Sequence, residues 1–392
     1  MYSEDDINSA VAAGAISAEA AANFRDHISR ARALPRQSEE NFRLINSFND
    51  IFVAIGIVIL LVALAAIGQA IGSAILPYPQ WADLSQLSGT QYTEARAAYD
   101  AQSNASIGLQ GALAGLLIAG AAWPLAEFFT RQRRMALPSI LLLLAFVASV
   151  FATAFGAGAA LGLTSSPAIG SAIVTLSGVL GGAAAYIHWR RFQVPITVAA
   201  AAGVVVLSLL IAMIGIFQID PGLPIFMALL LVAGLVVFAF AMRWDISDRG
   251  RTTRRSDVAF WLHLLAAPLI AHPIFSLVGV TDGANLGLAG AIAVLAIYIA
   301  FGLLALAIDR RALLVSALAY VLFALTFLFR EFGAVELGFA LTALVIGSAL
   351  LSLSAFWQTI RLSVVGVLPQ SVRAKLPEAT VVAPLAPATA QA

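Results

Sequence analysis

One stretch of the chain, residues 256–275 (SDVAFWLHLLAAPLIAHPIF), carries ionisable side chains and two prolines within an otherwise apolar run. In a bilayer such groups are costly, and each is therefore a candidate functional residue. A histidine can exchange a proton near neutral pH, and a proline inside a membrane helix frees carbonyls that often line a transporter's ligand site. The residues therefore suggest ligand binding or proton movement. The candidates are His263 and His272 as proton or hydrogen-bond partners, Pro268 as hinge, Asp257 as gate charge, and Trp261.

Helical geometry separates these candidates. At about 100° per residue, Asp257, Trp261, Pro268 and His272 share one face of a helix, and His263 points nearly the opposite way. The two histidines are also roughly 13–14 Å apart along an unbroken helix, so they cannot bind one metal ion together from this helix. We predict no metal site. A structural interpretation stays open, in which both histidines hydrogen-bond to neighbouring helices and only stabilise a bundle.

The composition excludes most soluble classes of protein. Of 392 residues, 61% are hydrophobic and 11% are charged, which is far more apolar than a soluble domain can bury. The chain has no cysteine and a formal net charge of +1, so it offers no thiol chemistry and no electrostatic argument for nucleic acid. The motifs HExxH, GxSxG and Walker A are absent from the sequence. These observations do not favour an enzyme, and they imply no cofactor.

The apolar residues group into runs of the length that a membrane-spanning helix needs, about 20 residues. Because the runs lack the alternation of barrel strands, the sequence predicts an all-α, polytopic transmembrane bundle over residues 51–360. We expect ten spans, at about 51–76, 107–129, 138–160, 168–187, 195–217, 223–242, 257–278, 285–308, 312–329 and 337–358.

The basic residues predict the orientation of the bundle. With ten spans, 20 of the 22 Lys and Arg residues fall on one side, and only Arg96 and Arg330 fall on the other. Cytoplasmic loops concentrate Lys and Arg, so we expect both termini in the cytoplasm. The first apolar run begins near residue 51 and is too long for a cleavable signal. Arginine also greatly outnumbers lysine, a bias typical of GC-rich bacterial genomes, which favours a bacterial inner membrane.

Several segments are expected outside the lipid. Residues 1–38 read as a cytosolic helical hairpin, with Ser3 and Asp6 as a capping box, Gly14 as a helix stop and Ser17 as a second cap. Its residues 3–34 hold few apolar side chains, so they would pack on the membrane domain, a protein partner or a second copy of the chain. Residues 39–50 read as an interfacial lead-in helix, 77–106 as a long outer loop with a short helix, and 361–392 as a cytosolic tail, disordered at its end.

Two further features are weaker signals. Glu127 lies near the end of the second span, four residues before Arg131, and we expect the two to pair. Pairs of glycines four residues apart allow helices to approach closely, and they predict packing faces. These pairs are Gly68/Gly72, Gly111/Gly115 and Gly178/Gly182.

Three stretches also carry a resemblance. VAAGAISAEAAANF, ENFRLINSFNDIF and DVAFWLHLLAAPLIAHPIF resemble uncharacterised bacterial multi-pass inner-membrane proteins that begin with a short cytosolic domain of unknown function. The resemblance implies an inner-membrane bundle of about ten spans, and it supplies neither an activity nor catalytic residues.

The sequence leaves two functions open. The first is a transporter-like or small-ligand-binding bundle with its site around residues 257–272. The alternative is a non-transporting scaffold or sensor that binds protein partners through the N-terminal hairpin and the outer loop. Histidines that face a continuous water-accessible cavity would favour transport. A dry core, in which both histidines hydrogen-bond to neighbouring helices, would favour the scaffold.

Overall fold

The computed structural model describes residues 4–24, 48–80, 87–220, 222–251, 253–279, 287–331 and 338–378. The chain divides into two units, residues 1–42 with 379–392, and residues 43–378. Within the described residues every regular element is a helix, which confirms the all-α fold class.

The first unit contains the start of the predicted hairpin. Helix α1, Glu4–Ala12, is followed by Gly14 at a φ of +70°, a left-handed conformation that glycine adopts without strain. Residues 18–24 are helical, and the Ser17 hydroxyl oxygen accepts a hydrogen bond from the Ala20 amide at 3.0 Å. Ser3, residues 25–47 and the tail from 379 onwards lie outside the described residues.

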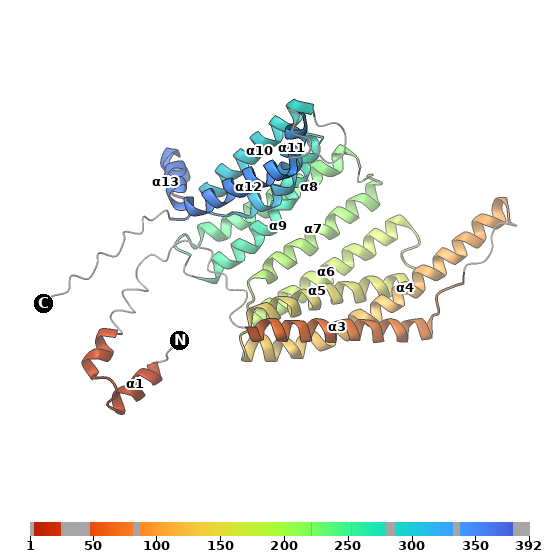
Figure 1. Cartoon of the computed structure of the whole chain (residues 1–392). Coiled ribbons are helices and arrows are strands. Elements are labelled where there is room, and N and C mark those ends of the chain that lie inside the picture. The colour runs from red at the N-terminus through yellow and green to blue at the C-terminus, as the bar shows by residue number, and fades with distance from the viewer. Residues whose placement is uncertain are drawn as a thin grey trace. The chain divides into compact units, whose positions relative to one another are not determined.

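The second unit is a bundle of long apolar helices (Figure 1). These elements are α3 (Phe48–Ile75), α4 (Gly89–Ala126), the π-helix η1 (Glu127–Gln132), α5 (Ala136–Ala160), α6 (Pro167–Phe192), α7 (Ile196–Phe217), α8 (Pro224–Ile246), α9 (Arg254–Leu277), α10 (Gly287–Ile308), α11 (Ala312–Glu331), α12 (Gly338–Ala355), α13 (Trp357–Val367) and α14 (Gln370–Arg373).

The helices have the length and composition of membrane spans. Nine in the described part of the chain could each cross a bilayer, and α12 with α13 forms a bent pair that could supply a tenth crossing. The protein is therefore a multi-pass membrane protein. The tenth expected span ends in a bend of 76°, and α13 turns away from the axis of α12 at this point.

Helix α4 is much longer than the span expected within it. Its 38 residues extend roughly 57 Å at 1.5 Å per residue, whereas a hydrocarbon core is about 30 Å thick. Residues 89–106, expected as part of an outer loop, thus form a helix continuous with the second span, and Figure 1 shows this part projecting beyond α5 and α6. The Ser106 hydroxyl donates to the Leu76 carbonyl at 2.7 Å, and Tyr78 packs edge-to-face on Tyr99.

Small residues permit a close contact between α3 and α4. A Cβ added at Gly68 of α3 would lie 2.5 Å from the Cα of Ala114, and one at Gly72 would lie 2.7 Å from the Cα of Gln110. Only a residue without a side chain permits this approach of α3 to α4, so the Gly68/Gly72 pair forms a packing face, as predicted. Gly111 has open space instead.

Helix α9 lies at the centre of the largest core. It packs against α7, α8 and α11, and it is the most buried of the nine candidate spans. Its apolar side chains share one cluster with those of the neighbouring helices. Fully or nearly fully buried members are Leu262, Phe275, Val294, Ala317 and Val321. The helix that carries most of the candidate residues is therefore surrounded by protein over much of its surface.

Candidate functional site at the arginine-rich end

The turns that carry most arginines meet at one end of the bundle, which we call the arginine-rich end. Arg191 at the end of α6 lies 2.6 Å from Glu127 of η1. Arg254 at the start of α9 donates to the Gln193 carbonyl at 3.5 Å. These contacts bring together turns that the alternation of basic residues assigned to one side. Which side of a membrane this end faces stays a prediction.

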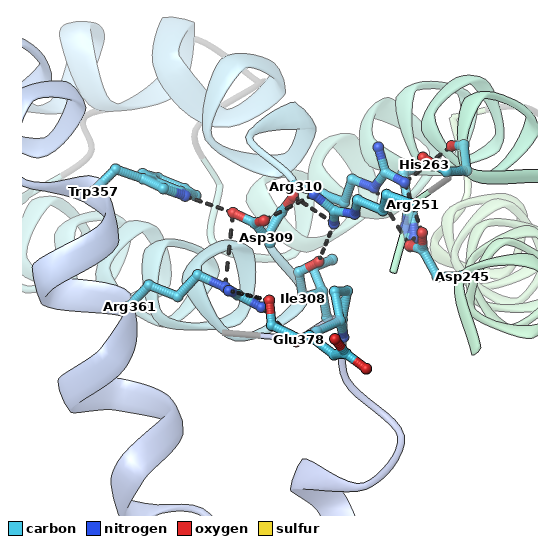
Figure 2. Close-up of polar contacts among 11 residues, drawn as sticks. Asp245, Arg251, His263, Ile308, Asp309, Arg310, Trp357, Arg361 and Glu378 are labelled. Carbon is cyan, nitrogen blue, oxygen red and sulfur yellow. Dashed lines mark hydrogen bonds and ion pairs between the residues drawn. The ribbon is translucent and has the colours of Figure 1, made fainter. Parts of the chain in front are cut away.

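At this end Asp245, in the last turn of α8, joins three segments. One carboxylate oxygen, Oδ1, accepts a hydrogen bond from Arg310 Nη2 at 2.6 Å, and Oδ2 lies 2.8 Å from Nε2 of His263 (Figure 2). Arg310 Nη2 also donates to the Ser256 carbonyl at 3.0 Å. Asp245 is 1% exposed and Arg310 3%. Buried charges persist where they are paired and hydrogen-bonded, so this contact locks α8 to α9 and to the turn after α10.

Of the side-chain types in this group, histidine is the one that titrates nearest to neutral pH in water. Its ring packs edge-to-face against Phe238 of α8 at 5.2 Å. Among the described residues Nδ1 has no hydrogen-bond partner. A neutral imidazole that donates through Nε2 to Asp245 keeps an acceptor at Nδ1, and this atom could take up a proton.

Asp309, after the last turn of α10, forms the second centre of the site. Its Oδ2 accepts from Arg251 Nη1 at 2.8 Å, and its Oδ1 accepts from the Trp357 indole N–H at 2.7 Å. The Nε atom of Arg361 lies 3.7 Å from the same Oδ1. Both Asp309 and Arg251 have φ above +50°, a sparsely populated region for residues other than glycine. This ion pair therefore stabilises two turns in a backbone conformation that Arg and Asp residues rarely adopt.

Arg251 also caps the end of α10. Its Nη2 donates to the carbonyls of Ile308 and Asp309 at 3.1 and 3.0 Å. Arg251 lies in the turn that joins α8 to α9. Burial of its guanidinium lowers the pKa of Arg251, and the nearby charge of Arg310 acts in the same direction. The carboxylate of Asp309 opposes both effects. We call Asp245, Arg251, His263, Asp309, Arg310, Trp357 and Arg361 together the charge cluster.

Residues 376–378, which we call the C-terminal segment, lie on the charge cluster. Arg361 of α13 is fully buried, and it donates to the carbonyls of Pro377 and Glu378 at 2.7 and 3.2 Å (Figure 2). Arg249 Nε donates to the Leu376 carbonyl at 2.8 Å. The Leu376 side chain is 5% exposed and packs in a cluster with Ile308 and Val365.

The structure does not gather the predicted candidates around one centre. His263 belongs to the charge cluster, whereas His272 Nδ1 lies 2.8 Å from the Tyr320 hydroxyl of α11. Trp261 and Asp257 are half-buried, and Pro268 is exposed on the surface of α9. The helix runs without interruption through Pro268 and Pro273, so a broken helix is not observed here.

Glu127 forms a separate group. Both of its carboxylate oxygens bind Arg191, at 2.6 and 3.1 Å, and one also contacts Arg131 at 3.4 Å. The predicted pair with Arg131 is confirmed, and the closer contact with Arg191 of α6 was not predicted. It ties the π-helix to α6.

Six residues of the charge cluster were not candidates in the sequence. These residues are Asp245, Arg251, Asp309, Arg310, Trp357 and Arg361. All of them lie outside the expected spans or at their ends, and the basic ones served only to orient the bundle. The available signal was the pair of acids, Asp245 and Asp309, beside arginine-rich turns in a chain with 21 acidic residues in all. Buried acids at span ends are expected to find cationic partners.

The residues described contain no group of three or more His, Cys, Asp or Glu side chains placed to hold a metal ion. Comparisons with protein-family models, with curated proteins and with solved structures gave no match. The resemblance to bacterial membrane proteins of unknown function stays a prediction.

Proposed function

We propose that this protein is a non-transporting membrane sensor or scaffold, in which protonation of His263 alters the packing of the C-terminal segment. One observation carries the proposal. The charge cluster connects a buried histidine of α9, through Asp245 and Arg310, to the turn that holds Asp309 and hence to Arg361 and residues 376–378.

The partners of the two histidines also support a sensor over a carrier. His263 bonds to α8 and His272 to α11, which is the arrangement expected of a scaffold. A proton on Nδ1 of His263 would give Asp245 a second full cation beside Arg310. The carboxylate of Asp245 would then be shared between two cations, which weakens its ion pair with Arg310. Because Arg310 directly follows Asp309 in the chain, we expect the contact between Asp309 and Arg361 to weaken as well.

The natural absence of cysteine allows a direct test. A single cysteine at Leu376→Cys reports exposure of the C-terminal segment, and one at the exposed Ser371→Cys reports the pH dependence of thiol reactivity itself. Both are labelled with a maleimide in reconstituted vesicles at pH 5.5 and 7.5. We expect the ratio of the Leu376→Cys rate to the Ser371→Cys rate to rise at pH 5.5.

The same ratio measured in a His263→Gln background is the control, because glutamine keeps a hydrogen bond to Asp245 without the titration. We expect no pH response there, and His263→Asn serves if that variant does not fold. An equal pH response with and without His263 would contradict the proposal.

Transport is the second candidate function, favoured by the buried acid–base pair of Asp245 and His263 within a bundle of spans. It predicts proton movement in vesicles that trap a pH-sensitive dye when sodium, potassium, phosphate, glutamate or lysine is added singly. The signal would disappear in Asp245→Asn. Absence of proton movement with all five solutes in the wild-type protein would count against it.

The setting is part of the proposal. We infer a bacterial inner membrane with both termini in the cytoplasm, supported by the arginine-rich turns that meet at one end of the bundle. In cells, a membrane-impermeant maleimide should label Ser371→Cys only after permeabilisation. Labelling of Ser371→Cys in intact cells would show that the arginine-rich end faces away from the cytoplasm.

A further inference from the structure

The C-terminal segment is held by an unusual kind of contact. Three consecutive carbonyl oxygens, those of Leu376, Pro377 and Glu378, each accept a hydrogen bond from a guanidinium group. Arg249 holds the first, and Arg361 holds the other two. Guanidinium groups bind carboxylate and phosphate oxygens more strongly than neutral carbonyls, because the acceptor then carries charge. The segment thus occupies positions that suit the oxygens of an anion.

The charge of Arg361 is incompletely balanced by its other neighbours. The guanidinium is fully buried, and among the described residues its ion-pair contact is with Asp309 at 3.7 Å, longer than a hydrogen bond. Asp309 already binds Arg251 at 2.8 Å and the Trp357 indole at 2.7 Å. Within the described part of the chain the Nε atom of Arg361 has no hydrogen-bond acceptor. A buried cation in this position has capacity for one more anionic partner.

We propose that Arg361 and Arg249 form a binding site for a phosphate-type oxyanion, which the chain's own C-terminal segment occupies in this structure. The segment is anchored by burial of Leu376 and Pro377 and by hydrogen bonds to its backbone. An oxyanion that displaced it would replace three neutral acceptors with charged oxygens. The same chemistry is offered by free phosphate and by the headgroup of an anionic lipid. This inference does not rest on the proton response above, because it is argued only from the hydrogen bonds that Arg249 and Arg361 donate to the segment.

The test removes the occupant and keeps the arginines. A chain that ends at Lys375 lacks the segment, and Leu376→Asn in the full chain removes the apolar anchor without adding a charge. Melting temperature is measured in detergent during titration with inorganic phosphate. In parallel, it is measured in micelles doped with phosphatidic acid or phosphatidylcholine. We expect a saturable rise for the truncated chain, with an apparent affinity about tenfold or more above that of the full chain, whose site must first be vacated.

The control is Arg361→Gln in the truncated chain, which keeps a hydrogen-bonding side chain and removes the charge. We expect it to abolish the rise. A response to inorganic phosphate assigns the site to a soluble anion, and a response to phosphatidic acid alone assigns it to a lipid headgroup; both support the proposal. Three results of these titrations would overturn it. These are no response to either probe, an equal response in Arg361→Gln, and an equal affinity in the full and truncated chains. Failure of both the truncated chain and Leu376→Asn to fold would also overturn it, because the segment would then be an integral part of the core.

Discussion

Asp245→Asn tests whether the charge cluster holds the second half of the bundle together. The substitution keeps the shape of the side chain and its place beside His263, and it removes the anion that Arg310 binds at 2.6 Å. Both side chains are 3% exposed or less, so water cannot replace the lost partner. Removing one member of a buried ion pair costs about 3–5 kcal/mol. At about 1.4 kcal/mol per tenfold, the unfolding equilibrium constant should rise by roughly 10²–10⁴.

The double variant Asp245→Leu with Arg310→Met separates the charge pair from simple loss of packing. Apolar side chains of similar volume often replace a buried ion pair at little cost, so we expect stability within about 2 kcal/mol of the wild-type protein. The free energy of unfolding of the wild-type protein, of Asp245→Asn and of the double variant is measured in mixed detergent micelles by tryptophan fluorescence. Glu127→Gln is the matched control, since its ion pair with Arg191 is partly exposed, and it should cost about 1 kcal/mol or less. A cost below about 1 kcal/mol for Asp245→Asn would refute the reasoning, as would a double variant that loses as much stability as Asp245→Asn or more.

Two other substitutions test the packing of the spans. Gly68→Val should destabilise the protein by about 1–3 kcal/mol, because its Cβ would meet the backbone of α4 at 2.5 Å, whereas Gly56→Val on the same helix has open space. Equal melting temperatures for these two variants would contradict the close contact between α3 and α4. Tyr320→Phe removes the hydroxyl that bonds His272, and we expect a loss of about 0.6 kcal/mol and at most about 1.7, as for other hydrogen bonds between membrane helices. A larger loss, measured by the same unfolding assay, would show that the hydroxyl does more than bond the histidine.

The spans could be predicted from the sequence because lipid imposes one strong condition, an apolar run of sufficient length. The turn at Gly14 and Ser17 could be predicted because local geometry decides it. The spacing of Gly68 and Gly72 predicted a packing face, but not that α4 would be its partner. The pairing of Asp245 with Arg310 could not. The two residues are separated by 65 positions, and their contact depends on which helix ends become neighbours in the bundle. No local pattern encodes that order.

The position of His263 illustrates the same limit from within one helix. Its place on the face of α9 opposite Asp257 was predicted from periodicity. The residue that His263 contacts was not predicted, because Asp245 lies just beyond the end of the span expected at 223–242. Residues at the margins of spans are assigned to turns, and their side chains can still reach into the neighbouring core.

The burial of α9 has a consequence for how the polypeptide is inserted during synthesis. This helix, with two prolines and two histidines, depends on contacts with α11, which the ribosome makes later. A nascent chain released after α9 would present polar groups to lipid without Tyr320 and Arg310 to satisfy them. The segment must then wait beside the translocon, paired with α8, until its later partners emerge. Stalled chains that stop between residues 280 and 310 should therefore be extracted from membranes more readily than chains that stop after α11.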